Sequence, residues 1–251
     1  MAGDPRSSVV ALLAPPAGPW TRRPRTIPTV IVSTFAAKLD ILPAAQRRLW
    51  DEFRDGLPSP FVLYGGTALA LRTGSRESED FDFFSNDPLD AHSLRDALSF
   101  LTHAELIRAA PSTATYLVDR AGPVKVSFFG GLPLGRVGEV SVCADNGVRV
   151  ASLLDLAAQK VRVVQIRAER KDYLDLMTLL AYGVSLPQAL GAARALYADF
   201  APLVTLKALS YFDDGDLGSL PNEVKQALSE AAAKVHTPAR VARLSDRLAE
   251  S

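Results

Sequence analysis

The sequence contains very little cysteine and histidine, which limits the chemistry open to it. Cys143 is the only cysteine in 251 residues, so a disulfide framework within one chain is excluded and a reducing, cytoplasmic location is expected. The three histidines, His92, His103 and His236, are scattered without metal-ligand spacing. A zinc site built on histidine is therefore not expected.

Net charge and long apolar runs are also missing. The 28 basic and 28 acidic residues cancel, which weakens the case for general nucleic-acid binding but leaves room for a local basic patch. No apolar run approaches the roughly 20 residues of a membrane helix, and the run at residues 9–13 is too short for a signal-peptide core. Apolar residues still make up 48% of the chain, so a packed core is expected.

The character of the chain changes twice along its length. Residues 1–28 are rich in proline, arginine and serine and lack sustained periodicity, so they are predicted to form a disordered tail. Residues 29–150 mix short strand-like runs with helical segments, whereas residues 151–251 show only helical periodicity. We therefore predict a mixed α/β domain at 29–150 and an all-α domain at 151–251.

Apolar periodicity and turn residues predict the individual elements. In the front half, helices are predicted at 34–53, 68–72 and 91–101, the last capped by Asp90, and strands at 61–64, 81–84, 104–109, 115–119, 124–129, 137–143 and 148–150. In the back half, helices are predicted at 153–167, 171–182, 186–197, 204–209, 223–234 and 238–249.

The most informative segment begins where a predicted strand ends at Gly65-Gly66. The missing side chains let backbone N–H groups approach a phosphate closely. Thr67 adds a hydroxyl, and the helix that it is expected to begin directs its positive end toward the same anion. The segment predicts a cradle for phosphate.

A pair of acids follows in Asp80-Phe81-Asp82. Residues two apart on a strand share a face, so both carboxylates are expected to project together. Such close like charges raise a pKa unless a cation lies between them, and oxygen ligands of this kind suit Mg²⁺ (or Mn²⁺), which also binds substrate phosphates. A Gly-Gly turn or an alternating edge strand alone is common, but together they predict transfer chemistry on a nucleoside triphosphate.

These residues carry a family resemblance. The stretch from Tyr64 to Arg72, with Arg76, Ser78 and the run from Asp80 to Ser85, resembles the AbiEii/AbiGii toxin family of the polymerase-β-like nucleotidyltransferase superfamily. Segments 155–160, 170–176 and 208–221 are also similar to that family, so the resemblance covers roughly residues 35–235. It implies an α/β (α+β) fold, with a nucleotidyltransferase-type mixed sheet flanked by helices and followed by an all-α helical domain.

The resemblance also implies roles for particular residues. Asp80 and Asp82 are expected to hold the metal, and both are expected to be catalytic together with Lys160 and Asp172. The set expected to bind the triphosphate is Gly65, Gly66, Thr67, Arg76 and Lys160.

Helical spacing supports part of this assignment. Lys160, Arg167 and Lys171 would form a basic stripe toward triphosphate or RNA if one helix carried them all. Asp175 shares a helix face with Asp172, and a salt bridge is its simplest role. Arg72 is expected to form ion pairs with Glu77 or Glu79, and the partner of Arg76 is left open between these acids and phosphate.

One position departs from the superfamily pattern. Many members place a third carboxylate on a later central strand, where the run at 124–128 offers Ser127. Asp119, Glu139 or Asp172 would then have to take the proton of an attacking hydroxyl. Otherwise the protein would bind nucleotide without turning it over efficiently.

The resemblance implies a toxin of a toxin–antitoxin or phage-defence pair, with a cognate antitoxin as partner. The expected reaction moves a nucleoside monophosphate from a nucleoside triphosphate to an acceptor, expected to be the 3′ end of tRNA, which blocks translation. The metal motif does not specify the acceptor. A protein or small-molecule acceptor, or a degenerate nucleotide-binding module, remain the alternatives.

Overall fold

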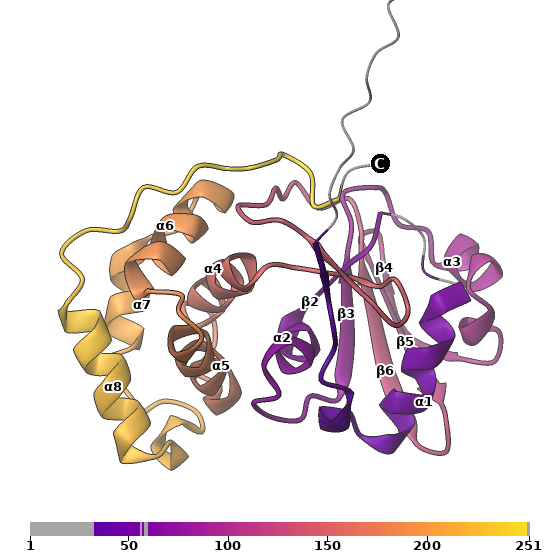
Figure 1. Ribbon diagram of the computed structural model, residues 1–251, viewed down its shortest axis with the longest axis horizontal. Helices are drawn as coiled ribbons and strands as arrows, with labels where there is room; N and C mark the ends of the chain where they lie inside the picture. The colour runs from indigo at the N-terminus through magenta and orange to yellow at the C-terminus, as the bar shows by residue number, and fades with distance from the viewer. Residues whose placement is uncertain (1–32, 56, 58–59, 250–251) are drawn as a thin grey trace, which may run out of the picture. The chain divides into compact units, whose positions relative to one another are not determined.

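The computed structural model describes residues 33–55, 57 and 60–249. Its N-terminal part, up to residue 150, forms a mixed β-sheet with helices on both faces (Figure 1). The predicted tail at 1–28 lies outside the described residues. Among the residues described, eight strands pair in the order β1-β7-β8-β2-β3-β6-β5-β4. They are β1 Ser33–Phe35, β2 Val62–Tyr64, β3 Asp80–Phe84, β4 Glu105–Ala110, β5 Thr113–Asp119, β6 Pro123–Phe129, β7 Ser141–Cys143 and β8 Arg149–Val150.

Helices cover both faces of this sheet. Their bounds are α1 Ala44–Glu52, α2 Gly65–Thr73, α3 Ala91–Ala97, α4 Leu153–Val163, α5 Arg170–Ala181, α6 Leu186–Leu196, α7 Pro202–Ala208 and α8 Asn222–Ala233. In Figure 1, α1 and α3 lie on one side of the sheet, and α2 and the helices from α4 onward lie on the other. Among these described helices, none is by itself long and apolar enough to cross a membrane, although the bent pair α5 and α6 meets that test together.

Strand β3 divides its side chains between the core and the opposite face. Phe81 and Phe83 are fully buried, and both rings pack against Phe53 beside α1. Because side chains alternate along a strand, Asp80 and Asp82 point to the other face. Burial of the two phenylalanines, worth about 2–3 kcal/mol each, therefore fixes the direction of the two carboxylates.

Three side chains connect the helices to the sheet or to neighbouring segments. Arg72 of α2 donates to the carbonyl oxygens of Val150 and Ala151, at 3.0 and 2.8 Å. Arg76, after α2, forms two hydrogen bonds with the carboxylate of Asp175 in α5, at 2.6 and 2.8 Å. The carboxylate of Asp155, in the first turn of α4, accepts from the loop before β7. The expected ion pairs of Arg72 with glutamates are wrong, since carbonyl oxygens are its partners.

The structure corrects the predicted elements at four places. The helix predicted at 34–53 begins only at Ala44, because Pro43 disfavours helical backbone before it, and residues 33–35 form β1 against β7. The strand predicted at 137–143 shortens to β7, since the N–H groups of Val137 and Gly138 bind Asp155 instead.

The other two corrections lie in the back half. The helix predicted at 153–167 ends at Val163, within a β-branched run that lowers helix propensity. The helix predicted at 238–249 is absent from these described residues. The chain there is irregular, and its backbone pairs with other segments: Ser245 bridges Arg136, and the Leu248 N–H donates to Asn86. The remaining predicted elements are present, with shifted ends.

The change of class near residue 150 is visible, since β8 ends at Val150 and α4 begins at Leu153. Residues from 32 onward nevertheless cluster as one compact unit. The division into domains at 29–150 and 151–251 stays a prediction.

The contacts of Asp155 generate a stability prediction. Its carboxylate accepts from Val137 N (2.8 Å), Gly138 N (3.1 Å) and Ser152 Oγ (2.6 Å). Asp155→Ala leaves these partly buried donors without an acceptor and should lower the free energy of unfolding by about 2–4 kcal/mol.

The control is Asp199→Ala. Asp199 has an exposed carboxylate that pairs with Arg162, a residue of the same helix, α4, as Asp155. It should cost less than about 1 kcal/mol. Chemical denaturation of both variants measures the difference, and equal losses would contradict the structural role of Asp155.

Candidate active site

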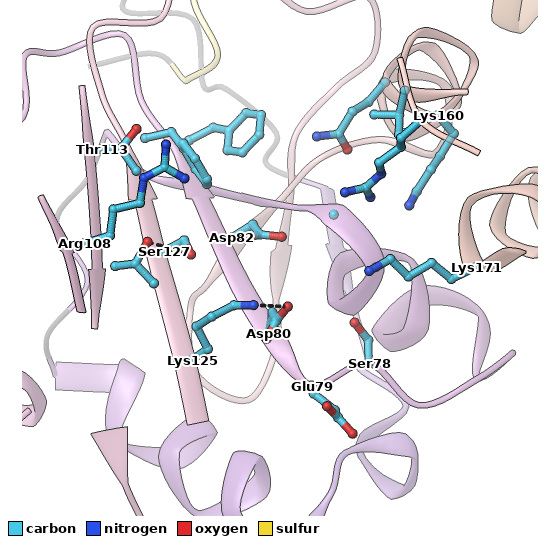
Figure 2. Close-up of a pocket in the computed structure, with 18 of the residues that line it drawn as sticks. Ser78, Glu79, Asp80, Asp82, Arg108, Thr113, Lys125, Ser127, Lys160 and Lys171 are labelled. Carbon is cyan, nitrogen blue, oxygen red and sulfur yellow. Dashed lines mark hydrogen bonds and ion pairs between the residues drawn. The ribbon is translucent and has the colours of Figure 1, made fainter. Parts of the chain in front are cut away.

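A cavity of about 1010 Å³ opens on the face of the sheet that carries Asp80 and Asp82. Strands β3 to β6 form one wall, the start of α2 contributes a second, and the end of α4 with the start of α5 forms a third. Figure 2 shows the two aspartates between Arg108 on one side and Lys160 and Lys171 on the other. The structure thus brings together most of the residues that the sequence singled out.

The glycines at the start of α2 are required by close packing. Gly65 has a φ of +75°, and a Cβ there would lie 2.6 Å from Oδ2 of Asp82. A Cβ on Gly66 would lie 2.7 Å from Oγ of Ser78. No side chain caps the N-terminus of α2 among the described residues, so its first-turn N–H groups are available to an anion beside the cavity.

Thr67 has a different position from the one predicted. The helix begins at Gly65, and Thr67 is fully buried in its first turn. Its hydroxyl donates to the carbonyl oxygen of Asp80 and does not line the cavity. Thr67 therefore ties the glycine turn to the start of β3, and its predicted contact with the triphosphate has no support in this geometry.

Asp80 and Asp82 line the cavity together but differ in surroundings. Asp80 pairs with Lys125 of β6, with 2.7 Å between Oδ2 and Nζ. Burial raises the pKa of Asp82 to about 6, and the charge of Asp80 adds to the rise, while Lys125 and Lys160 oppose it. A bound cation would relieve the cost of ionising Asp82 beside Asp80.

The donor set fits a divalent ion that binds together with its substrate. Among the described residues, no group of three or more histidine, cysteine, aspartate and glutamate side chains is placed to hold a metal. Asp80 and Asp82 would supply two carboxylates. Mg²⁺ commonly binds with one or two carboxylates and completes its shell with phosphate oxygens and water.

Ser127 occupies the place beside Asp82 where many members of the superfamily are expected to carry a third acid. The two residues are register partners on β3 and β6, and Ser127 is 4% exposed, with a hydrogen bond from Thr115. The alternatives lie elsewhere: Asp119 accepts from the N–H of Gly122, and Glu139 pairs with Arg136. Neither lines the cavity.

A buried ion network supports the helical wall. Nζ of Lys160 lies 2.8 Å from Asp172 and 2.6 Å from Asp175, and both carboxylates are at most 1% exposed. Arg167 also binds Asp172, and Arg76 binds Asp175. Burial alone would raise the pKa of Asp172, but the hydrogen bond from Arg167 and the charge of Lys160 outweigh it, and the pKa lies below its usual value.

Not all residues of this ion network line the cavity. Asp172 and Asp175 do not line the cavity, whereas Arg76, Lys160 and Arg167 do. The salt bridge predicted for Asp175 is confirmed, and Asp172 has the same kind of position. In this geometry Asp172 holds two cavity cations in place and does not itself face the space where a substrate would bind.

Arg167 and Lys171 line the cavity, although α4 ends before either residue. The prediction that one helix carries Lys160, Arg167 and Lys171 as a basic stripe is therefore wrong. Arg167 lies in the loop after α4 and Lys171 in the first turn of α5. Both side chains also pair with Glu169.

Sequence patterns missed several residues of the sheet wall. Lys125, Arg108 and Thr113 all line the cavity. Alternation along the run at 124–128 would have placed Lys125 on the same face as Ser127. The place of Arg108 depends on an irregularity in β4 that leaves no mark in the sequence pattern.

Comparisons with known proteins agree with this geometry. Residues 47–241 match the family model described as "Nucleotidyl transferase AbiEii toxin, Type IV TA system". An uncharacterised protein of Aquifex aeolicus (strain VF5) is 31% identical over 163 residues, which cover 63% of this chain and 77% of the relative. The solved structure of MenT4, a nucleotidyltransferase toxin of Mycobacterium tuberculosis H37Rv, aligns with a TM-score of 0.50 and 12% identity over 75% of this chain and 82% of that one. The predicted fold class is confirmed.

The pKa of Asp82 generates a pH-dependent stability prediction. Between its ordinary value of 3.8 and about 6, the folded protein binds more protons at this carboxyl than the unfolded chain does. Stability therefore falls as the pH rises through this window, and the full cost is present above it. Asp82→Asn removes that cost and should stabilise the metal-free protein at pH 7.5 by on the order of 1–3 kcal/mol.

Thermal unfolding of both proteins between pH 4 and pH 8 measures the effect. The gain should be smallest near pH 4, where the folded carboxyl is protonated and the unfolded one, with its ordinary pKa of 3.8, is only partly ionised. Asp96→Asn, at an exposed position outside the cavity, is the matched control and should change little. A constant difference across the pH range would show that Asp82 does not titrate as described.

Proposed function

The chain belongs to the AbiEii family of nucleotidyltransferase toxins, and from this we propose that it transfers a nucleoside monophosphate from a nucleoside triphosphate to the 3′ end of tRNA. The observation that carries the proposal is the meeting of two carboxylates, Asp80 and Asp82, with the uncapped start of α2 in one cavity. Lys160 and Lys171 face them from the helical wall. An anion cradle, two acids and nearby cations are what nucleotidyl transfer needs.

The proposed step is a displacement at the α-phosphorus. The terminal ribose oxygen of the acceptor forms a bond to the α-phosphorus, the bond from that phosphorus to the oxygen of the β-phosphate breaks, and pyrophosphate leaves. The proton of the attacking hydroxyl is released to solvent. In this scheme the N–H groups of Gly65 and Gly66 bind phosphate oxygens, and Lys160 and Lys171 offset the charge of the leaving pyrophosphate.

Asp80 and Asp82 would hold Mg²⁺ (or Mn²⁺), which when bound neutralises phosphate charge and orients the triphosphate. The two carboxylates reach that role because β3 directs both into the cavity. Lys125 would have to release Asp80 for it to serve as a ligand, since the two side chains are paired at 2.7 Å.

The biological role follows from the proposed acceptor. A tRNA extended at its 3′ end cannot be aminoacylated, so translation would stop in the cytoplasm of the producing cell. The family is described as part of a type IV toxin–antitoxin system, and we include a cognate antitoxin and a use in phage defence in the proposal.

A labelling assay tests the proposed reaction. Purified protein is incubated with total tRNA, Mg²⁺ and each α-labelled nucleoside triphosphate in turn, beside Asp80→Ala. The expected result is label on tRNA with the wild type and a loss of at least about 10³-fold in the variant. The circular dichroism spectrum of the variant must match that of the wild type.

Ser127 favours one second candidate, a module that binds nucleotide but transfers it inefficiently. If the wild type binds triphosphate and labels neither tRNA, protein nor small hydroxyl compounds, this candidate replaces the proposal. If protein or a small molecule is labelled and tRNA is not, the reaction stands and the acceptor is wrong.

A further inference from the structure

The sheet wall of the cavity carries a row of polar side chains that begins at Asp82. Each residue is the register partner of the next on an adjacent strand: Asp82 of β3, Ser127 of β6, Thr115 of β5 and Arg108 of β4. All four line the cavity. The row crosses four strands at right angles to their direction, so it extends away from the two carboxylates over the open part of the sheet.

An irregularity in β4 places Arg108 in this row. Leu106 pairs with Tyr116, but Arg108 pairs with Thr115, so Ile107 is an extra residue opposite the same partner. In an unbroken ladder Ile107 would face Thr115, and Arg108 would face Ala114, which is fully buried. Bulges of this kind re-aim a side chain beside a functional site, and here the bulge turns a cation toward the cavity.

Arg108 differs from the other cations of the cavity because it has no partner in the described part of the chain. Lys125 pairs with Asp80, Lys160 with Asp172 and Asp175, and Lys171 with Glu169. Arg76 and Arg167 are likewise paired. Arg108 is exposed and makes no hydrogen bond or ion pair with any described residue. Its charge is therefore available to an anion from outside.

We propose that this row, Ser127–Thr115–Arg108, is the track along which the acceptor strand lies, with its terminal hydroxyl at Asp82 and an upstream backbone phosphate on Arg108. The proposal rests on the proposed function and names its acceptor subsite. Arg108 lies three strand spacings from Asp82, roughly 14 Å. A stacked strand that rises about 3.4 Å per nucleotide covers this distance in about four nucleotides.

The chemistry of the row fits a nucleic-acid strand better than a smaller acceptor. Between its ends the row holds Ser127 and Thr115, whose hydroxyls are hydrogen-bonded to each other at the cavity floor, and no carboxylate that would repel a phosphate. Ile107, 47% exposed beside Arg108, adds apolar surface for a base. Figure 2 shows Arg108 and Ser127 on the opposite side of the aspartates from Lys160 and Lys171, so the acceptor and the triphosphate would approach from different walls.

Arg108→Gln removes the proposed phosphate contact without touching the triphosphate wall. The KM for tRNA should rise about tenfold, while the KM for the nucleoside triphosphate stays unchanged. The slope of log(kcat/KM) for tRNA against log[salt] should become shallower by about 0.7–1. Arg194→Gln removes the same charge from an exposed position on α6 outside the cavity and should leave all three values at the wild-type level.

A series of RNA acceptors that carry the tRNA 3′ sequence, from one to eight nucleotides long, locates the contact. The wild type should gain efficiency in a step at about three to five nucleotides, and Arg108→Gln should lack that step. The same step in both proteins overturns the track alone, because the wild type still labels RNA. Failure of the wild type to label any RNA overturns the proposed function, and the track with it.

Discussion

The alternation of side chains along β3 is the constraint on which the site depends. Phe81 and Phe83 are fixed in the core against Phe53, so Asp80 and Asp82 cannot turn away from the cavity or from each other. The cost is electrostatic, because a partly buried carboxyl beside a second one has a raised pKa. The site is thus built around a negative charge that a divalent cation would relieve, and the core holds the two carboxylates in place.

The helical wall carries charges of the opposite sign, because it holds several cations close together. Lys160, Arg167 and Arg76 would repel one another if Asp172 and Asp175 did not lie between them. Removing one partner of such a buried network leaves an uncompensated charge, which typically costs about 3–5 kcal/mol. Substitutions at Asp172 or Asp175 would therefore displace cations of the cavity wall, even though neither carboxylate lines the cavity.

The sequence predicts those parts of the site that depend on local geometry. A period of two places Asp80 with Asp82, and the glycine turn precedes the helix that it begins. Sequence patterns fail where contacts between distant residues determine the structure. Arg76 meets Asp175 across 99 positions. The segment at 238–249 is irregular because its partners lie both on α6 and in the sheet half. Arg108 is a third case, because a one-residue bulge inverts the face that alternation would assign to it.

A Mn²⁺ titration monitored by electron paramagnetic resonance would show whether Asp80 and Asp82 bind a metal together with the triphosphate. It is carried out with and without a nucleoside triphosphate that resists cleavage between its α- and β-phosphates. We expect the triphosphate to tighten Mn²⁺ binding at least about tenfold in the wild type, and Asp82→Asn to lose this coupling while it keeps its fold. Equal Mn²⁺ binding and equal coupling in the two proteins would show that Asp80 and Asp82 are not where the metal and the triphosphate meet.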